Sequence, residues 1–258
     1  MEDIPGSSGL WDHPLYQSAK QNRDRYAAID IIDQIAKDDV LNEIYDCHFN
    51  DSDGAEWPYI IAPAKTIGNR NNSLAISYAE WLGHEFGWPV EERVFQQKTM
   101  SRDRNGAWFR LAHRTTFYGA VHAGRNYVIV DDVMTMGGTL ADLKGFIESQ
   151  GGRVICMSVL AHRSGRNVHI SLANSTLSAL QCHHGPSLGE FCEKELGYDD
   201  DCLTEPEAIR LLNAASLDRV REALDGARNP SNARGSSFRS RRASSPLSAT
   251  PKPPYGRR

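Results

Sequence analysis

A short run near the middle of the chain combines two carboxylates with a loop rich in glycine and threonine. Asp131 and Asp132 follow the apolar residues 127–130, and residues 135–139 then lead into an amphipathic segment. The two glycines of this loop permit close backbone approach and unusual dihedral angles, and its threonines add hydroxyl donors. A following helix would present unpaired N–H groups there, so the loop is suited to binding a phosphate.

The acidic pair adds a second feature to this site. Two carboxylates ahead of the loop repel phosphate, but they accept hydrogen bonds from two neighbouring sugar hydroxyls. The combination therefore predicts a sugar phosphate as the ligand. The alternative interpretation is a polar turn between a strand and a capped helix, without any ligand.

The elements around the loop must hold it at the edge of a sheet. Residues 127–130 are continuously apolar, which is typical of a strand buried on both faces of a parallel sheet. The periodic segment 140–150 predicts a helix that stops at the glycines 151–152, and residues 154–161 predict the next strand. We therefore expect an α/β fold with a mostly parallel, doubly wound sheet, which binds ligands at the carboxyl ends of its strands.

Apolar spacing also predicts the elements before this unit. Helices are expected over residues 23–36 and 74–86, and strands over 59–62 and 90–95. Residues 96–114 are polar and basic, so we interpret them as a long exposed loop.

After residue 163 the pattern predicts mainly helices. These cover residues 170–180 and 189–196, and a third begins with a capping box at Thr204 and runs to about residue 224. The end of the chain is rich in Ser, Pro and Gly and is expected to be disordered. The domain scheme is an N-terminal extension (1–22), an α/β core (23–163), a helical C-terminal appendage that could serve as a hood (164–226) and a basic tail (227–258).

Composition and charge exclude several classes of protein. The 258 residues are 40% hydrophobic and 24% charged, as in ordinary globular proteins, and no apolar stretch is long enough to span a membrane. The first residues do not resemble a secretory signal, so a cytoplasmic protein is expected. Of the net charge of −4, the tail contributes eight positive charges, which leaves −12 on the rest. A nucleic-acid-binding folded part is therefore not expected, although the tail allows weak, non-specific contact.

The five cysteines lack any C-x-x-C pair, which predicts reduced thiols and neither a disulfide framework nor a zinc ribbon. Residues 182–184, Cys-His-His, are interpreted as a polar helix end or loop. A metal site there is the alternative, but no second pair of ligands follows at finger-like spacing.

The run VIVDDVMTMGGTL, residues 128–140, closely resembles the phosphoribosyl pyrophosphate (PRPP) signature of the type I phosphoribosyltransferases. The resemblance implies that Asp131 and Asp132 hold the ribose hydroxyls. It also implies a magnesium ion, bound mainly through PRPP and with the same two aspartates as further candidate ligands. The cradle for the sugar's terminal phosphate would consist of Thr135, Met136, Gly137, Gly138 and Thr139.

The resemblance also implies two further loops. A pyrophosphate loop follows the first core strand in this family, and Ala64, Lys65 and Thr66 occupy that place, with Lys65 suited to holding the leaving group. A mobile basic lid is expected within residues 96–114, where Lys98 and Arg102 are candidates, as are Arg104 and Arg110. Solvated charges in exposed loops are the alternative for all of these residues.

The function implied is transfer of the phosphoribosyl group of PRPP to a nitrogen nucleophile, a nucleobase or analogue, with release of pyrophosphate. A regulator that binds PRPP without catalysis is the alternative. The expected partners are PRPP, a small nitrogen acceptor and a second copy of the chain in a homodimer. The stretches FYGAVHAGRNYVIVDDV and FCEKELGYDDDCLTEPEAIRLL resemble an uncharacterised bacterial branch of phosphoribosyltransferase-domain proteins, and neither identifies a base.

Two other classes fit the sequence poorly. A phospho-acceptor receiver domain needs an aspartate at a later strand end, but no aspartate occurs in residues 143–198. A dinucleotide-binding fold needs G-x-G-x-x-G at a helix start, and the chain has none.

Overall fold

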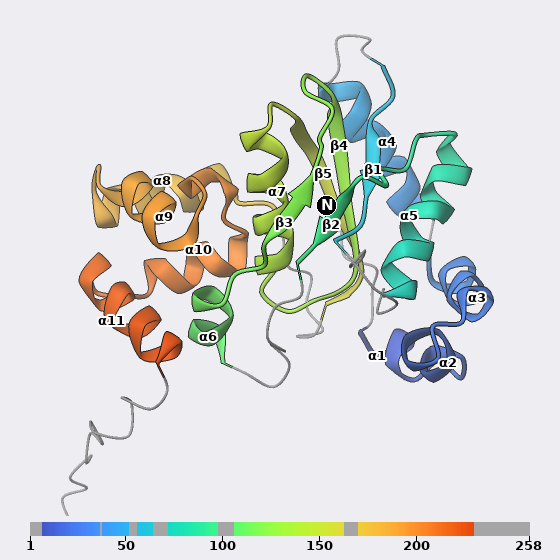
Figure 1. Ribbon diagram of the computed structural model, residues 1–258, viewed down its shortest axis with the longest axis horizontal. Coiled ribbons are helices and arrows are strands. Elements are labelled where there is room, and N and C mark those ends of the chain that lie inside the picture. Colours follow the sequence, from blue (N-terminus) through green and yellow to red (C-terminus); the bar gives the residue numbers. More distant parts are fainter. Residues whose placement is uncertain are drawn as a thin grey trace, which may run out of the picture.

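A parallel sheet of three strands lies at the centre of the structure (Figure 1). The strands are β1 (Tyr59–Ile61), β4 (Asn126–Met134) and β5 (Arg153–His162), in the order β1-β4-β5. Between β4 and β5 the chain forms α7 (Gly138–Ser149), which confirms the predicted βαβ unit. This computed structural model describes residues 7–36, 38–51, 56–63, 72–97, 106–162 and 170–229.

Helices surround the sheet on both sides (Figure 1). On the N-terminal side they are α1 (Ser7–Trp11), α2 (Tyr16–Gln21), α3 (Arg25–Ile35), α4 (Asp38–Asp51) and α5 (Ser73–Phe86). After the sheet come α8 (Asn174–His184), α9 (Leu188–Leu196), the 3-10 turn η1 (Asp200–Cys202), α10 (Glu205–Leu212) and α11 (Leu217–Arg228). The helices predicted over residues 23–36, 74–86 and 140–150 are confirmed.

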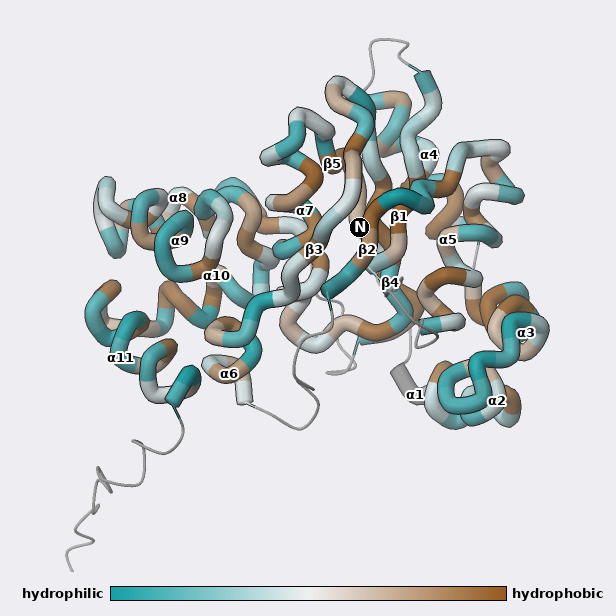
Figure 2. The backbone as a smooth tube through the Cα atoms, in the orientation of Figure 1, coloured by the Kyte–Doolittle hydropathy of each residue, from teal (hydrophilic) through white to brown (hydrophobic). Residues whose placement is uncertain are grey.

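Successive side chains of β4 point to opposite faces of the sheet, and helices cover both faces. Val128 and Val130 belong to a core that includes α3, α4 and α5, whereas Tyr127 and Ile129 belong to one that includes α7. Hydrophobic residues, brown in Figure 2, accordingly follow the central strands. The prediction of an α/β fold with a mostly parallel sheet is therefore confirmed.

The strand expected over residues 90–95 is different in the structure. Only β2 (Val94–Gln96) forms, and it pairs antiparallel with β3 (Phe117–Gly119), which the sequence analysis did not predict. Val90 contributes a single parallel bridge to Ile60. The chain then turns because the Glu91 carboxylate accepts a hydrogen bond from the backbone N–H of Arg93 (2.8 Å), so the ribbon leaves the main sheet.

The expected loop over residues 96–114 is not a loop throughout, which is a correction. Helix α6 (Ala107–Ala112) forms in its second half, and Leu111 is buried among residues of α8 to α11. The Arg210 guanidinium also lies 4.9 Å above the Trp108 ring. Burial of these apolar side chains by distant helices stabilises a segment whose average composition is polar. Residues 98–105 lie outside the described part of the chain.

The C-terminal helices also differ in detail from expectation. The single helix predicted over residues 204–224 is two helices, because the chain breaks after α10 and Ser216 caps α11 by accepting the N–H of Arg219 (3.3 Å). Helix α11 extends two residues into the predicted tail, where Arg228 Nη1 lies 2.9 Å from Glu195 Oε2. The tail beyond residue 229 lies outside the described residues.

The Cys-His-His run forms the end of α8, so of the two interpretations the helix end is correct. Both imidazoles are engaged by backbone carbonyls, His183 Nε2 with Ala214 at 2.9 Å and His184 Nε2 with Leu211 at 3.0 Å. In the part of the chain that the structure describes, no helix combines the length and apolarity needed to cross a membrane.

Candidate phosphate and sugar site

The loop between β4 and α7 encloses a small cavity of about 80 Å³. All five residues predicted for the phosphate cradle line it, together with Asp131, Arg110 and neighbouring residues of the loop. The cavity lies at the carboxyl end of the central strand, where open α/β sheets bind their ligands. The structure thus brings the residues of the motif together around one hollow.

Gly137 gives the loop its shape. It is buried, and its φ of 81° lies in the left-handed region that favours glycine. A Cβ at this position would lie 2.6 Å from Thr204 Cγ2 and 3.1 Å from Met134 Sδ. Gly137 precedes the first turn of α7, whose N–H groups have no intrahelical acceptor and carry a partial positive charge. The loop therefore offers an anion the start of a helix of 12 residues.

The two aspartates occupy different environments. Asp131 is half-buried and lines the cavity, whereas Asp132 is buried and forms an ion pair with Lys20. Asp132 Oδ1 also accepts hydrogen bonds from Asn72 Nδ2 and from the backbone N–H of Val133, both at 2.9 Å. Both oxygens of Asp132 are therefore engaged, and Asp131 is the carboxylate of the pair that lines the cavity.

The surroundings of Asp131 shift its pKa. Burial and the Asp132 carboxylate raise the pKa of Asp131 to about 8. Burial lowers the pKa of Lys20, but the attraction of Asp132 and Asp131 outweighs it, so the net pKa of Lys20 is raised. Two carboxylates held together against their repulsion are more common at functional sites than elsewhere.

Sequence reasoning missed two of these residues. Lys20 lies on α2, within the segment interpreted as an N-terminal extension, and Asn72 immediately precedes α5. Lys20 Nζ also donates to Asn72 Oδ1 at 3.2 Å. Nothing local in the sequence marks Lys20, because its partner lies 112 residues away. Asn72 carried a weak indication, since asparagine is common just before a helix.

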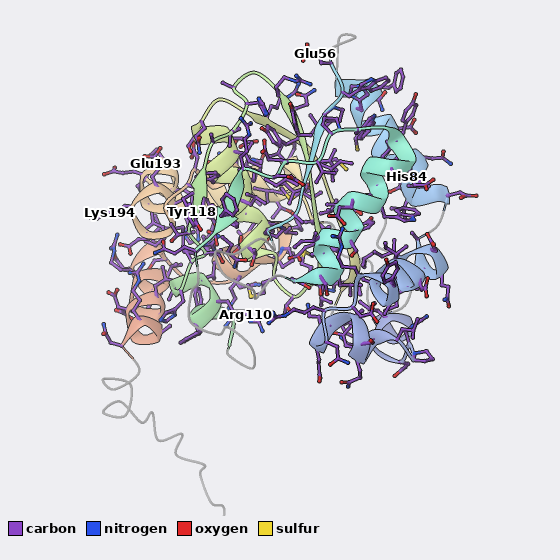
Figure 3. The ribbon with its side chains drawn as sticks, turned by 45° about the vertical axis from the view of Figure 1, so that its right-hand side comes forward. Glu56, His84, Arg110, Tyr118, Glu193 and Lys194 are labelled. Atoms are coloured by element: carbon purple, nitrogen blue, oxygen red, sulfur yellow. The ribbon has the colours of Figure 1, made fainter. Side chains whose placement is uncertain are left out.

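Of the residues predicted for the pyrophosphate loop and the lid, Arg110 alone lies in the described part of the chain. Arg110 lies on α6 (Figure 3), and its side chain is among those that line the cavity. The predicted pyrophosphate-loop residues Ala64, Lys65 and Thr66, and the lid residues Lys98, Arg102 and Arg104, lie outside the described part of the chain.

Replacing Lys20 is expected to destabilise the protein. Lys20→Met leaves Asp132 buried without its cation, which should lower the free energy of unfolding by about 1–3 kcal/mol, less than for a fully buried pair because Lys20 is partly exposed. Urea denaturation measures this change. Arg219→Met is the control, because the Arg219–Glu222 pair is exposed and contributes little. Equal losses in the two variants would contradict a special role for Lys20.

Comparison with known proteins gives sequence relatives and structural neighbours. No family model matches the chain. It is 33% identical to protein TraN of Escherichia coli over 220 residues, which cover 85% of this chain and 48% of TraN. It is also 34% identical over 77 residues, 25% of this chain and 32% of the relative, to an orotate phosphoribosyltransferase of Coccidioides immitis. The chain spans less than half the length of the curated relatives it matches.

Similar solved structures include phosphoribosyltransferases. The adenine phosphoribosyltransferase of Thermoanaerobacter pseudethanolicus matches with a TM-score of 0.32 and 18% identity, over 55% of this chain and 72% of that one. The hypoxanthine phosphoribosyltransferase of Trypanosoma cruzi matches with a TM-score of 0.32 and 15% identity, over 50% of this chain and 64% of that one. The sequence match to the orotate phosphoribosyltransferase agrees with the resemblance that the signature run indicates, and the fold class rests on the sheet topology described above.

Proposed function

We propose that the chain binds PRPP with Mg²⁺ at the cavity between β4 and α7 and transfers the phosphoribosyl group to a nitrogen nucleophile, a nucleobase or analogue. The observation that carries this proposal is the 80 Å³ cavity, which gathers the complete signature loop and Asp131 at the carboxyl end of the central strand. A polar turn without a ligand would not require a buried, left-handed glycine and a carboxyl group with a raised pKa at the same cavity.

In this proposal the cradle anchors the terminal phosphate of the sugar. The first N–H groups of α7 and the hydroxyls of Thr135 and Thr139 donate to the phosphate oxygens. Arg110 adds a positive charge at the same cavity. Asp131 accepts hydrogen bonds from the ribose hydroxyls, and Asp132, whose oxygens are engaged, holds Asp131 in place through the hydrogen bond from its N–H to Asp131 Oδ1 (2.9 Å).

The residues around the cavity fit a magnesium ion bound mainly through its substrate. Mg²⁺ prefers oxygen ligands and uses few carboxylates from the protein, and Asp131 supplies one carboxylate at the edge of the cavity. Asp132 is the second candidate ligand, although its contact with Lys20 would have to be given up. When bound, the ion neutralises the negative charge of the pyrophosphate.

The proposed reaction is a displacement at the anomeric carbon of the ribose. The lone pair of the acceptor nitrogen forms the new C–N bond, the C–O bond to pyrophosphate breaks, and pyrophosphate leaves with the bonding electrons. A proton on the acceptor nitrogen passes to solvent. The cradle and Asp131 keep the ribose fixed during this step, and Lys65 is our candidate for stabilising the departing pyrophosphate.

A PRPP-binding regulator without catalysis is the second candidate. The ion pair between Lys20 and Asp132 favours it, because this pair joins the N-terminal helices to the proposed sugar site. A ligand that displaces Lys20 would change the packing of α2, and a partner protein that binds α2 would recognise this change.

Two measurements on the full chain separate these functions. Calorimetry tests binding of PRPP in the presence of Mg²⁺, and a pyrophosphate-release screen with free purines, pyrimidines and their analogues tests transfer. Binding with release for one base establishes a transferase, and binding without release for any base favours the regulator. Absence of PRPP binding overturns both proposals.

Arg110 is expected to contribute to phosphate binding. Arg110→Gln removes a charged donor at the cavity and should weaken PRPP binding about tenfold, as for the loss of one charge-assisted hydrogen bond. Calorimetry at constant ionic strength measures the effect. Lys194→Gln is the matched control, because Lys194 is exposed on α9, away from the cavity (Figure 3). A similar loss in both variants would indicate a general charge effect.

A further inference from the structure

Two side chains from outside the cradle are hydrogen-bonded to its backbone. Thr204 Oγ1, at the start of α10, donates to the carbonyl oxygen of Met136 at 2.6 Å. Arg114 Nη2 donates to the carbonyl oxygen of Gly138 at 3.1 Å. Two of the peptide groups in the signature loop are therefore held by side chains from distant parts of the sequence.

Fixing these carbonyls also fixes the donors of the loop. In a planar trans peptide the C=O and the following N–H point in opposite directions. The contact of Thr204 with the Met136 carbonyl therefore sets the direction of the Gly137 N–H. In the same way, the contact of Arg114 with the Gly138 carbonyl sets the direction of the Thr139 N–H. These N–H groups belong to residues that line the cavity.

A buried polar network holds Arg114 and Thr204 in turn. Arg114 Nε lies 2.6 Å from Asp142 Oδ1, and its Nη1 lies 2.7 Å from Glu207 Oε1. Glu207 Oε2 also accepts the backbone N–H of Thr204 at 3.3 Å. The side chains of Arg114, Asp142 and Glu207 are 13%, 4% and 1% exposed. A satisfied network at this depth favours one arrangement, because each member loses its partners if another moves.

We infer that Thr204 and Arg114 are positioning residues for the phosphate cradle, and that the C-terminal helices act as a brace behind the cradle. This inference rests on the proposed function, since it concerns how the same loop presents its N–H groups to phosphate. The brace also accounts for the contact of Thr204 with Gly137, because the γ-methyl group of Thr204 fills the space where any other side chain would begin.

A role of Thr204 only as the first residue of α10 is the competing explanation. A residue that merely begins a helix needs to bond only with that helix. The side chain of Thr204 does take part in the capping box of α10 with Glu207, but its hydroxyl also donates out of the helix, to the carbonyl of Met136, 68 residues earlier in the sequence.

The test compares Thr204→Val, which loses the hydroxyl but keeps the shape, with Thr204→Ser, which keeps the hydroxyl. Ser216→Ala is the matched control, because it removes the cap of α11 and Ser216 is not one of the described residues that line the cavity. Calorimetry measures binding of PRPP with Mg²⁺, and separately of inorganic phosphate, and thermal unfolding measures the stability of each variant.

We expect Thr204→Val to bind both probes about tenfold more weakly, Thr204→Ser to stay within about twofold of the unchanged protein, and Ser216→Ala to lose stability but not affinity. Unchanged affinity in Thr204→Val, or an equal loss in Ser216→Ala, overturns the inference. If the unchanged protein binds phosphate but not PRPP, the proposed function fails and the phosphate measurements still decide the inference. Binding of neither probe overturns both.

Discussion

Gly137→Val is expected to abolish PRPP binding and to lower the free energy of unfolding by about 2–6 kcal/mol. The left-handed φ of 81° costs about 1–3 kcal/mol for a residue with a side chain, and a β-branched residue is among the least tolerant. Its Cβ would also meet Thr204 Cγ2 at 2.6 Å, which adds about 1–3 kcal/mol of overpacking. Because the loop must move to relieve both, several donors to the phosphate are lost together.

Thermal unfolding and PRPP calorimetry on the same preparation measure both effects. The separate contribution of Thr204 can be isolated with Gly137→Ala, alone and combined with Thr204→Ser. Serine lacks the γ-methyl group that lies nearest to the added Cβ, so the combined variant should be about 1 kcal/mol more stable than the sum of the single changes predicts. Strict additivity would contradict this contact, and normal PRPP binding by a stable Gly137→Val protein would contradict the proposed site.

The aspartates are expected to give the second largest effect. At pH 9, where Asp131 is ionised, Asp131→Asn combined with Asp132→Asn should weaken PRPP binding roughly tenfold or more, since a charge-assisted hydrogen bond contributes about 1.5–3 kcal/mol. Asp131→Asn alone should produce most of this loss, because Asp131 faces the cavity and Asp132 is engaged by Lys20 and Asn72. Calorimetry with the two single variants and the double variant measures how the loss of PRPP affinity is divided between the two aspartates. An equal loss from each single change would contradict the different environments of the two carboxylates.

Asp131→Asn should also change the free energy of unfolding by an amount that depends on pH. The pKa of Asp131 is raised from its usual 3.8 to about 8, so the folded state binds this proton more tightly than the unfolded state does. The unchanged protein therefore loses stability as the pH rises from about 4 to 8, a loss that a neutral asparagine does not share. The variant should be relatively most stable above pH 8, and urea denaturation at several pH values measures the difference. A constant difference across this range would count against the raised pKa.

The sequence was sufficient to predict the central elements. The apolar run before Asp131 predicted a strand because β4 is buried on both faces, which removes the usual alternation. It did not predict how far β4 continues. The strand extends through both aspartates to Met134, because its pairing with β5 continues that far. The loop residues were predicted as one site, since they are contiguous in the sequence.

The residues that support the loop could not be predicted in this way. Lys20, Arg114 and Thr204 support the loop through contacts with residues far away in the sequence, and no local pattern indicates those contacts. Helix α6 was missed for the same reason, because Leu111 is buried by helices that follow it by many residues. The spacing of apolar residues indicates which side chains of one helix or strand are buried, but it does not indicate which helices and strands pack against each other.

Because the chain is synthesised from its N-terminus, the cavity becomes able to bind a ligand only late in synthesis. The Lys20–Asp132 pair spans 112 residues and the Thr204–Met136 contact spans 68, so both ends of the described chain must be present before the loop is held. The βαβ unit itself is local and can form earlier, because short-range contacts require less loop closure. A nascent chain that has emerged only as far as β5 would therefore contain the signature loop without its C-terminal support, and we expect ligand binding to begin only after α10 has emerged and docked.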